Sequence, residues 1–139
     1  MAEETTQLRV RLVTPVRTLF EQTADSVLLP SKTGYIEVQA GHAPLLSELG
    51  VGEVNIAAAE GEQKFYVGWG FVEVLPDRVT ILASEAQKPE EIDVQAAERQ
   101  LDLGIEQSKK GDDSLEASDA AQRIMDEAEA RLAVAGEKS

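Results

Sequence analysis

The spacing of apolar residues changes once along this chain, at Lys88-Pro89, and that change limits the folds open to it. Before this point apolar residues recur at every second position, as in Leu8, Val10 and Leu12, which is typical of strands with one buried face. After it they recur at helical spacing and alanine becomes frequent. The sequence therefore predicts two parts, an all-β domain over residues 1–88 and an α-helical domain over residues 89–139.

Turn signals divide the first part into about nine short strands, because clusters of proline, glycine and serine interrupt it every 8–12 residues or so. We expect strands at residues 8–12, 16–20, 25–29, 35–39, 45–50, 54–58, 64–68, 71–75 and 79–83. No helical segment of useful length lies between them. The pattern therefore favours a β-sandwich or barrel over a parallel α/β sheet.

The second part contains two amphipathic segments joined by a short loop, which predicts an antiparallel two-helix hairpin. The expected apolar faces are Val94, Ala97, Leu101 and Ile105 on the first helix, and Ala117, Ala121, Ile124, Ala128 and Leu132 on the second. Alanine buries little apolar area, so such a hairpin would dock on the sandwich with a modest free energy. We expect it to be detachable, the alternative being a small hairpin fixed in place.

Net charge limits the partners of this chain. The formal net charge is -13, from 13 basic and 26 acidic residues, so a phosphate backbone or an anionic lipid surface would meet net repulsion. We therefore expect no nucleic-acid partner and no direct lipid insertion, and a basic protein partner is favoured. The alternative is that the charge serves solubility alone. No run approaches the roughly 20 apolar residues of a membrane helix, and the acidic start of the chain does not resemble a signal peptide.

The residue types that catalysis needs do not form a recognisable group. The chain has no cysteine and one histidine, His42, which stands between glycine and alanine and has no second metal ligand nearby in the sequence. No serine has a base other than this histidine, and neither two-glycine pattern opens a helix or carries a P-loop lysine. The sequence therefore predicts no catalytic residue, no metal site and no cofactor.

Several motifs, in a fixed order, resemble one family. The run Gly41-His42-Ala43-Pro44-Leu45-Leu46 matches its most distinctive segment without change, and Gly68-Trp69-Gly70-Phe71-Val72-Glu73-Val74 is similar to its Gly-Gly-Phe-X-Glu-Val segment. Val13-Thr14-Pro15 stands at its early strand pair, and Ile92-Asp93 opens the helical part as in relatives. Together these motifs cover nearly the whole chain and resemble the epsilon subunit of F-type ATP synthase.

The resemblance implies a sandwich of about ten strands followed by an antiparallel two-helix hairpin. It implies a non-catalytic rotor subunit of the central stalk that binds the gamma subunit and the c-ring and helps to couple ion flow to ATP synthesis. The hairpin of some relatives extends to the alpha/beta catalytic head and inhibits ATP hydrolysis. We expect a peripheral position at the cytoplasmic face of a bacterial inner membrane. The alternative function is a free-standing β-sandwich binding or adaptor module.

The resemblance also suggests contact residues in two turns, which we expect at one rim of the sandwich. The candidate interface residues are Ser31, Lys32, Thr33, Tyr35, Gly41, His42, Ala43 and Pro44. Tyr35 and His42 are the strongest of these, since each presents a partly polar aromatic tip.

Two departures from the family limit what can be carried over. Some relatives bind ATP through an Ile/Leu-Asp-X-X-Arg-Ala motif, and the corresponding residues here are Ile92, Asp93, Ala96 and Ala97, so alanine replaces the arginine that would meet phosphate. The sequence therefore predicts weak or absent ATP binding. The second helix carries only two basic residues, Arg123 and Arg131, among five carboxylates, so we expect weaker inhibition by the hairpin, or inhibition that uses these two arginines alone.

Overall fold

The computed structural model describes residues 7–110 and 115–136, and strands and helices follow each other there in the predicted order. The strands are β1 (Leu8–Val13), β2 (Thr18–Ala24), β3 (Ser26–Ser31), β4 (Gly34–Gln39), β5 (Leu45–Leu49), β6 (Gly52–Ala58), β7 (Gly61–Leu75) and β8 (Arg78–Gln87). A short 3-10 helix, η1 (Pro89–Glu91), leads into α1 (Val94–Lys109) and α2 (Leu115–Ala135). The β-sandwich followed by two helices is thus confirmed, with eight strands in the described residues where about ten were expected.

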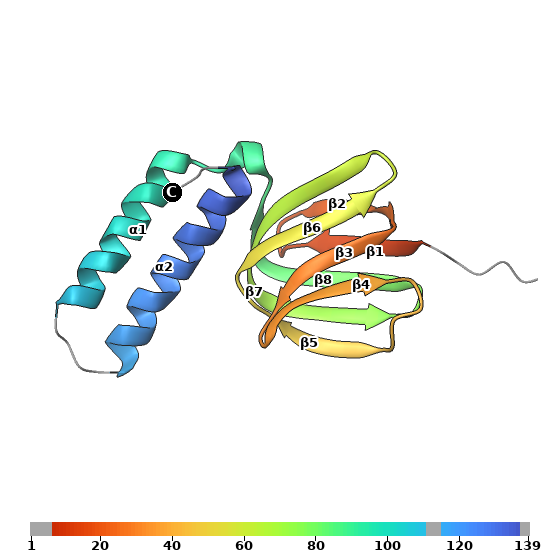
Figure 1. Ribbon diagram of the computed structural model, residues 1–139, viewed down its shortest axis with the longest axis horizontal. Coiled ribbons are helices and arrows are strands. Elements are labelled where there is room, and N and C mark those ends of the chain that lie inside the picture. The colour runs from red at the N-terminus through yellow and green to blue at the C-terminus, as the bar shows by residue number, and fades with distance from the viewer. Residues whose placement is uncertain (1–6, 111–114, 137–139) are drawn as a thin grey trace, which may run out of the picture.

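Two layers make up the sandwich (Figure 1). One layer has the order β2-β1-β8-β7-β5, in which β1 and β8 run parallel and the other neighbours run antiparallel. In the other layer β3 pairs with β4 and β6, and β6 pairs with the first half of β7. Since most neighbours run antiparallel, short turns suffice to join them, as the many turn residues of the sequence require.

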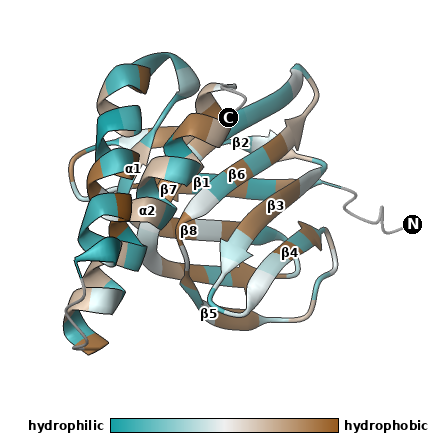
Figure 2. Ribbon diagram, turned by 60° about the vertical axis from the view of Figure 1, so that its left-hand side comes forward, coloured by the Kyte–Doolittle hydropathy of each residue, from teal (hydrophilic) through white to brown (hydrophobic). Residues whose placement is uncertain are grey.

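Alternation of side chains along the strands builds the core between the layers. Leu8, Val10 and Leu12 of β1 are fully buried, whereas the arginines between them are exposed. Bands of hydrophobic and hydrophilic colour accordingly alternate along the strands in Figure 2. The other large side chains with no exposed surface in this core are Val27, Leu29, Val38, Val54, Ile56, Val67, Val72, Val74, Val79 and Ile81.

Strand β7 corrects the prediction of two separate strands at residues 64–68 and 71–75. It is one 15-residue strand that pairs with β6 up to Val67 and with β5 from Gly70 onward. Trp69 lies at the change of partner with a φ of 47°, in the left-handed region that side chains rarely adopt. A Cβ at Gly70 would collide with the carbonyl oxygen of Leu82, so the glycine permits β8 to approach. The glycines mark a bend within a strand that serves both layers, rather than a turn between two strands.

The two helices form the predicted antiparallel hairpin, called the hairpin below. Asp93 caps α1 by accepting a hydrogen bond from the Ala96 backbone N–H at 3.0 Å. Gly104 lets the helices approach closely, because a Cβ there would lie 2.7 Å from Cγ of Met125. Helix α2 lies between α1 and the sandwich and contacts β6 and β7 (Figure 1).

Candidate functional site

The hairpin meets the sandwich mainly through polar side chains, because the apolar contact between them is small. Tyr66, Ile92 and Val134 are the buried members of the hydrophobic cluster at this junction. The predicted apolar faces are only partly buried: Ala97, Ala121, Ala128 and Leu132 are buried, and hydrophilic colour dominates much of both helices in Figure 2. The docking of α2 therefore depends on a few specific polar contacts.

Arg131 makes the densest of these contacts. Its guanidinium donates from Nε to Oε1 of Gln87 at 3.0 Å, from Nη1 to Oε1 of Gln100 at 3.0 Å and from Nη2 to Oε1 of Glu85 at 3.1 Å. The same group stacks 4.4 Å from the ring centroid of Tyr66, and only 19% of the Arg131 side chain is exposed. One arginine thereby joins α2, α1 and β8, and we call Arg131 with its four partners the arginine clamp.

Tyr66 supports the clamp from inside the sandwich. Its hydroxyl donates to Oε1 of Glu85 at 2.7 Å, so this oxygen accepts from both Tyr66 and Arg131. Burial of the ring and the hydrogen bond to Glu85 raise the pKa of Tyr66. The phenol therefore stays protonated and remains a donor at any pH the protein meets.

A second group of polar contacts lies one to two helical turns before Arg131 on α2, around Trp69. The indole Nε1 donates to Oε2 of Glu127 at 2.9 Å, and Arg123 Nε donates to the same oxygen at 3.2 Å. The Arg123 guanidinium lies 4.4 Å from the ring centroid of Trp69, a cation–π distance. Both arginines that the sequence proposed as regulatory thus contact aromatic residues of β7 in this position of the hairpin.

The root of the hairpin is tied to the loop between β1 and β2. Glu91 of η1 accepts two hydrogen bonds at 2.7 Å from Arg17, and one from the Lys88 backbone N–H at 2.7 Å. These bonds, with that from Arg17 the strongest cause, lower the pKa of Glu91 from its ordinary 4.5 to about 2. Glu91 is therefore ionised at neutral pH and holds η1 against the loop between β1 and β2.

The residues that correspond to the ATP-binding motif of some relatives have structural roles in this fold. Ile92 is buried against Tyr66 and Val134, and Asp93 caps α1. A cavity of about 150 Å³ is lined by Gln87, Asp93, Ala96, Ala97, Gln100 and Arg131. Ligand pockets usually measure roughly 300–1,000 Å³, so this cavity is smaller than most of them. Its one cationic side chain, Arg131, is already bound by the partners of the clamp.

The two candidate contact turns lie at opposite ends of the sandwich, so the prediction of one shared rim is wrong. Ser31 pairs with Leu49, at the end of β5 that faces the hairpin, whereas Gly41 donates its N–H to the carbonyl of Pro76 at 2.7 Å, at the far end. Figure 1 shows the β3–β4 turn and the β4–β5 connection on opposite sides. Because β4 runs the full length of the sandwich between these turns, they cannot meet.

Local contacts already use several of the candidate side chains. Lys32 pairs with Glu48 at 2.9 Å, and the Tyr35 hydroxyl accepts from the Glu53 backbone N–H at 2.9 Å. His42 Nδ1 lies 2.6 Å from the carbonyl of Ala43. Thr33, Gly41, Ala43 and Pro44 are exposed, whereas Ser31 is buried and bonds the carbonyl of Gly34. Their role in an interface remains a prediction.

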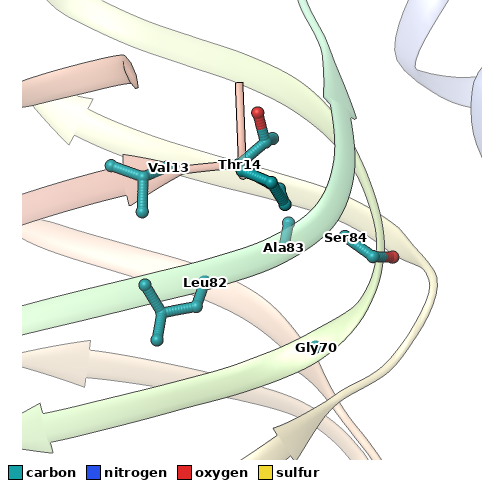
Figure 3. Close-up of a pocket in the computed structure, with 7 residues that line it drawn as sticks. Val13, Thr14, Gly70, Leu82, Ala83 and Ser84 are labelled. Carbon is teal, nitrogen blue, oxygen red and sulfur yellow. The ribbon is translucent and has the colours of Figure 1, made fainter. Parts of the chain in front are cut away.

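An exposed surface that sequence reasoning missed lies on the outer side of the layer that contains β1. Val13, Leu82 and Phe71 stand side by side across β1, β8 and β7, and Leu82 and Phe71 are 49% and 54% exposed. Next to them is a hollow of about 350 Å³ that runs from Val13 to Gly70 (Figure 3). The sequence contained a sign of this surface, since Leu82 and Phe71 occupy positions of their strands that alternation places on the solvent-facing side.

The described residues contain no group of three or more potential metal-binding side chains, and no helix among them is long and apolar enough to cross a membrane.

Comparisons with known proteins agree with the fold. Residues 7–89 match the family described as ATP synthase, Delta/Epsilon chain, beta-sandwich domain. An ATP synthase epsilon chain of Koribacter versatilis is 47% identical over 88 residues, which cover 63% of this chain and 61% of that one. An epsilon chain of Solibacter usitatus is 38% identical over 134 residues, covering 94% and 97%.

Among solved structures, a chain in the cryo-EM structure of the Euglena gracilis mitochondrial ATP synthase (OSCP/F1/c-ring) superposes with a TM-score of 0.82 at 20% identity. The match covers 95% of this chain and 83% of that one. This likeness concerns the fold alone, whereas the sequence matches extend from the sandwich through the hairpin. The chain therefore belongs to the epsilon-chain family of F-type ATP synthases.

Proposed function

We propose that this chain is a non-catalytic subunit of the ATP synthase central stalk, where it turns with the rotor and helps to couple ion flow through the c-ring to ATP synthesis. The observation that carries the proposal is the alignment with an epsilon chain over 94% of the chain, sandwich and hairpin together. The gamma subunit and the c-ring are the expected partners, in keeping with the F1/c-ring complex that contains the structural relative. Bacterial relatives support a peripheral place at the cytoplasmic face of a bacterial membrane.

Add-back to a depleted enzyme tests this proposal. The cognate ATP synthase is stripped of this subunit, returned to vesicles and supplied with an imposed ion gradient, and ATP synthesis is measured with and without the full chain. We expect the chain to restore synthesis in a saturable, stoichiometric manner. An unrelated acidic β-sandwich protein serves as the control. If the chain restores no more synthesis than this control, the proposed function is wrong and an adaptor function is favoured.

We also propose that the hairpin is a movable inhibitory element that the arginine clamp holds on the sandwich. The polar character of the docking supports this, since polar contacts of modest free energy can be exchanged for other partners. In the docked position Arg123 and Arg131 contact Trp69 and Tyr66, so an extended hairpin would have to release both arginines before using them on the catalytic head.

The substitution Glu85→Ala tests this regulatory role without altering the hairpin itself. It removes the carboxylate that Arg131 contacts from the sandwich side. ATP hydrolysis by the depleted catalytic complex is titrated with the wild-type chain and with this variant, and we expect stronger inhibition by the variant. The matched control is Glu73→Ala, an exposed carboxylate on β7 far from the hairpin. Equal inhibition by all three chains would show that the arginine clamp does not restrain an inhibitory hairpin.

Finally, we propose that the chain binds ATP weakly or not at all. The small cavity beside Asp93 contains one cation, and all three of its donor nitrogens already meet acceptors. A phosphate group would therefore have to break the clamp and would face the carboxylate of Asp93. Calorimetric titration with about 1 mM ATP should give no binding heat, and clear saturation in that range would contradict this reasoning.

A further inference from the structure

Trp69 has a backbone conformation that suits glycine. Its φ of 47° lies in the left-handed region, where the other described residues with a positive φ are all glycines: Gly34, Gly41, Gly61 and Gly136. A Cβ in this region crowds the following carbonyl oxygen, which carries an equilibrium penalty of roughly 5- to 30-fold. The chain thus has its only tryptophan at a position where glycine would avoid this penalty.

The sandwich, rather than the hairpin, imposes this conformation on Trp69. Its neighbours Gly68 and Gly70 both belong to the ladder with β8, and Oγ of Ser84 on β8 donates to the Gly68 carbonyl at 2.6 Å. Trp69 is also the point at which β7 exchanges β6 for β5 as its partner. None of these bonds involves α2, so the sandwich bears the backbone strain whether or not the hairpin is docked.

The side chain of Trp69, in contrast, contacts the hairpin. Its indole N–H donates to Glu127, whose side chain is only 17% exposed, and the Arg123 guanidinium covers the ring. The other carboxylate oxygen of Glu127 accepts from Nε2 of Gln100 at 3.5 Å, so the contact also reaches α1. The arginine clamp lies one helical turn beyond Glu127 on α2. Two attachments fix both the axial position and the rotation of α2, whereas one would leave the helix free to turn.

We propose that Trp69 is a positioning residue that latches the hairpin in its docked place, and that the sandwich tolerates a strained backbone because of this latch. The strain weakens the sandwich, whereas the side chain strengthens only the docked state, so the two effects act on different equilibria. Substitution by glycine separates them, since it removes the strain from the sandwich and the latch from the hairpin. A side chain that merely filled space in the sandwich would stabilise both. The consequence for inhibition rests on the proposed function of the hairpin, but the latch itself does not.

Release of the hairpin is measured in the full chain by energy transfer between labels on two introduced cysteines, Thr33→Cys and Ser118→Cys. Both positions are exposed, and the chain has no cysteine of its own. Urea titration gives the release midpoint, and hydrogen exchange at the backbone amides of β1 and β8 reports opening of the sandwich. In Trp69→Gly the hairpin should dock about tenfold more weakly, because a hydrogen bond to a carboxylate and a cation–π contact are lost. Its sandwich should open no more readily than that of the wild type.

Trp69→Ala is the matched comparison, because it removes the same contacts as Trp69→Gly but keeps a Cβ in the left-handed region. Both variants should release the hairpin alike, whereas the sandwich of Trp69→Ala should open about fivefold more readily than that of Trp69→Gly. Trp69→Phe keeps an aromatic ring but lacks the N–H donor, so its release midpoint should lie between those of the wild type and Trp69→Gly. Phe71→Ala removes an exposed ring from the same strand and should leave release of the hairpin unchanged.

Two results would overturn the latch. One is release of the hairpin in Trp69→Gly at the same urea concentration as in the wild type. The other is a sandwich that opens more readily, and to the same extent, in the glycine and alanine variants. Titration of the depleted catalytic complex separates this inference from the proposed inhibition, since Trp69→Gly should inhibit ATP hydrolysis more strongly than the wild type. Weaker docking without stronger inhibition would support the latch and refute the inhibitory role of the hairpin.

Discussion

Replacing Arg131 by alanine should release the hairpin from the sandwich while both parts stay folded. The side chain joins α2 to β8 and to α1, and the buried apolar cluster that the described residues form at this junction is small. Removal of the guanidinium leaves Glu85 in a position where water can reach it, because 44% of its side chain is already exposed. The loss should therefore fall on docking rather than on the folding of either part.

The magnitude follows from the contacts that are lost. A neutral hydrogen bond contributes about 1 kcal/mol net, and a charged one about 1.5–3 kcal/mol before the partial exposure of the Glu85 carboxylate is discounted. The stacking on Tyr66 adds about 0.5–1 kcal/mol. Since such contributions overlap, we expect a total of about 2–4 kcal/mol, which corresponds to a shift of roughly 30- to 1,000-fold in the docking equilibrium.

Trp69 provides the assay, because it is the only tryptophan of the chain and its indole bonds to Glu127 on α2. Urea titration followed by tryptophan emission should show release of the hairpin at lower urea in Arg131→Ala than in the wild type. The arginine that contacts the Trp69 ring is Arg123, and Arg131 lies eight residues farther along α2. A change of tryptophan emission in Arg131→Ala therefore reports the release of the hairpin rather than the loss of a direct contact with the indole. Hydrogen exchange at the backbone amides of β1 and β8 monitors opening of the sandwich in the same samples, and its midpoint should change little.

Arg99→Ala on the exposed side of α1 is the control and should behave as the wild type. Glu85→Ala should resemble Arg131→Ala, and the double variant should be less destabilised than the sum of the two, since both remove the same contact. An unchanged tryptophan transition in Arg131→Ala would refute the clamp. A shift of equal size in the unfolding midpoint of the sandwich would also refute the clamp.

Two further substitutions test the root of the hairpin and the bend of β7. The pKa of Glu91 is about 2 in the folded chain, below its ordinary 4.5, so its contribution to stability is full above pH 4.5 and is lost as pH falls toward 2. Thermal midpoints of Glu91→Gln and of the wild type should differ at pH 6 and converge near pH 2, and a constant difference would contradict the ion pair with Arg17. Gly70→Ala should destabilise the sandwich by about 1–3 kcal/mol in urea denaturation, because its Cβ meets the Leu82 carbonyl; unchanged stability would mean that β8 moves away freely.

The layered fold was predictable because the buried faces of the strands are regular. Strict alternation in Leu8, Val10 and Leu12 leaves one register in which all three are buried, and a slip of one residue would expose them. The change to helical spacing near Pro89 was equally plain, and η1 begins there. Such local periodicity is what a sequence expresses most directly.

The errors arose where distant residues decide the outcome. Gly68 and Gly70 resembled residues of a strand-end turn or a bulge, and only the register with β5, β6 and β8 shows that they form a bend in one long strand. The two contact turns were expected at one rim, yet β4 lies between them and places them at opposite ends of the sandwich. The arginine clamp was invisible because Glu85 and Arg131 are 46 residues apart and neither stands in a local motif.

The docked contacts of Arg123 and Arg131 could not be predicted from the sequence. The resemblance to the family suggested an external partner for these two arginines, and that regulatory role stays a prediction. In the docked hairpin their guanidinium groups lie against the aromatic rings of Trp69 and Tyr66, which come from a strand far away in the sequence. Stacking of this kind leaves no periodic signal, so only the three-dimensional arrangement reveals it.

The continuity of β7 has a mechanical consequence. Its bend, from Tyr66 to Trp69, lies beside α2, and its last residues lie beside Pro76 and the loop of Gly41, so the half from Gly70 to Leu75 connects the hairpin end to the far end of the sandwich. A force along this half loads the ladders with β5 and β8 in shear, with many hydrogen bonds sharing the load at once. Peeling would instead open those bonds one by one. In a subunit that turns with a rotor, β7 therefore resists extension along its length, and it bends most easily at Trp69.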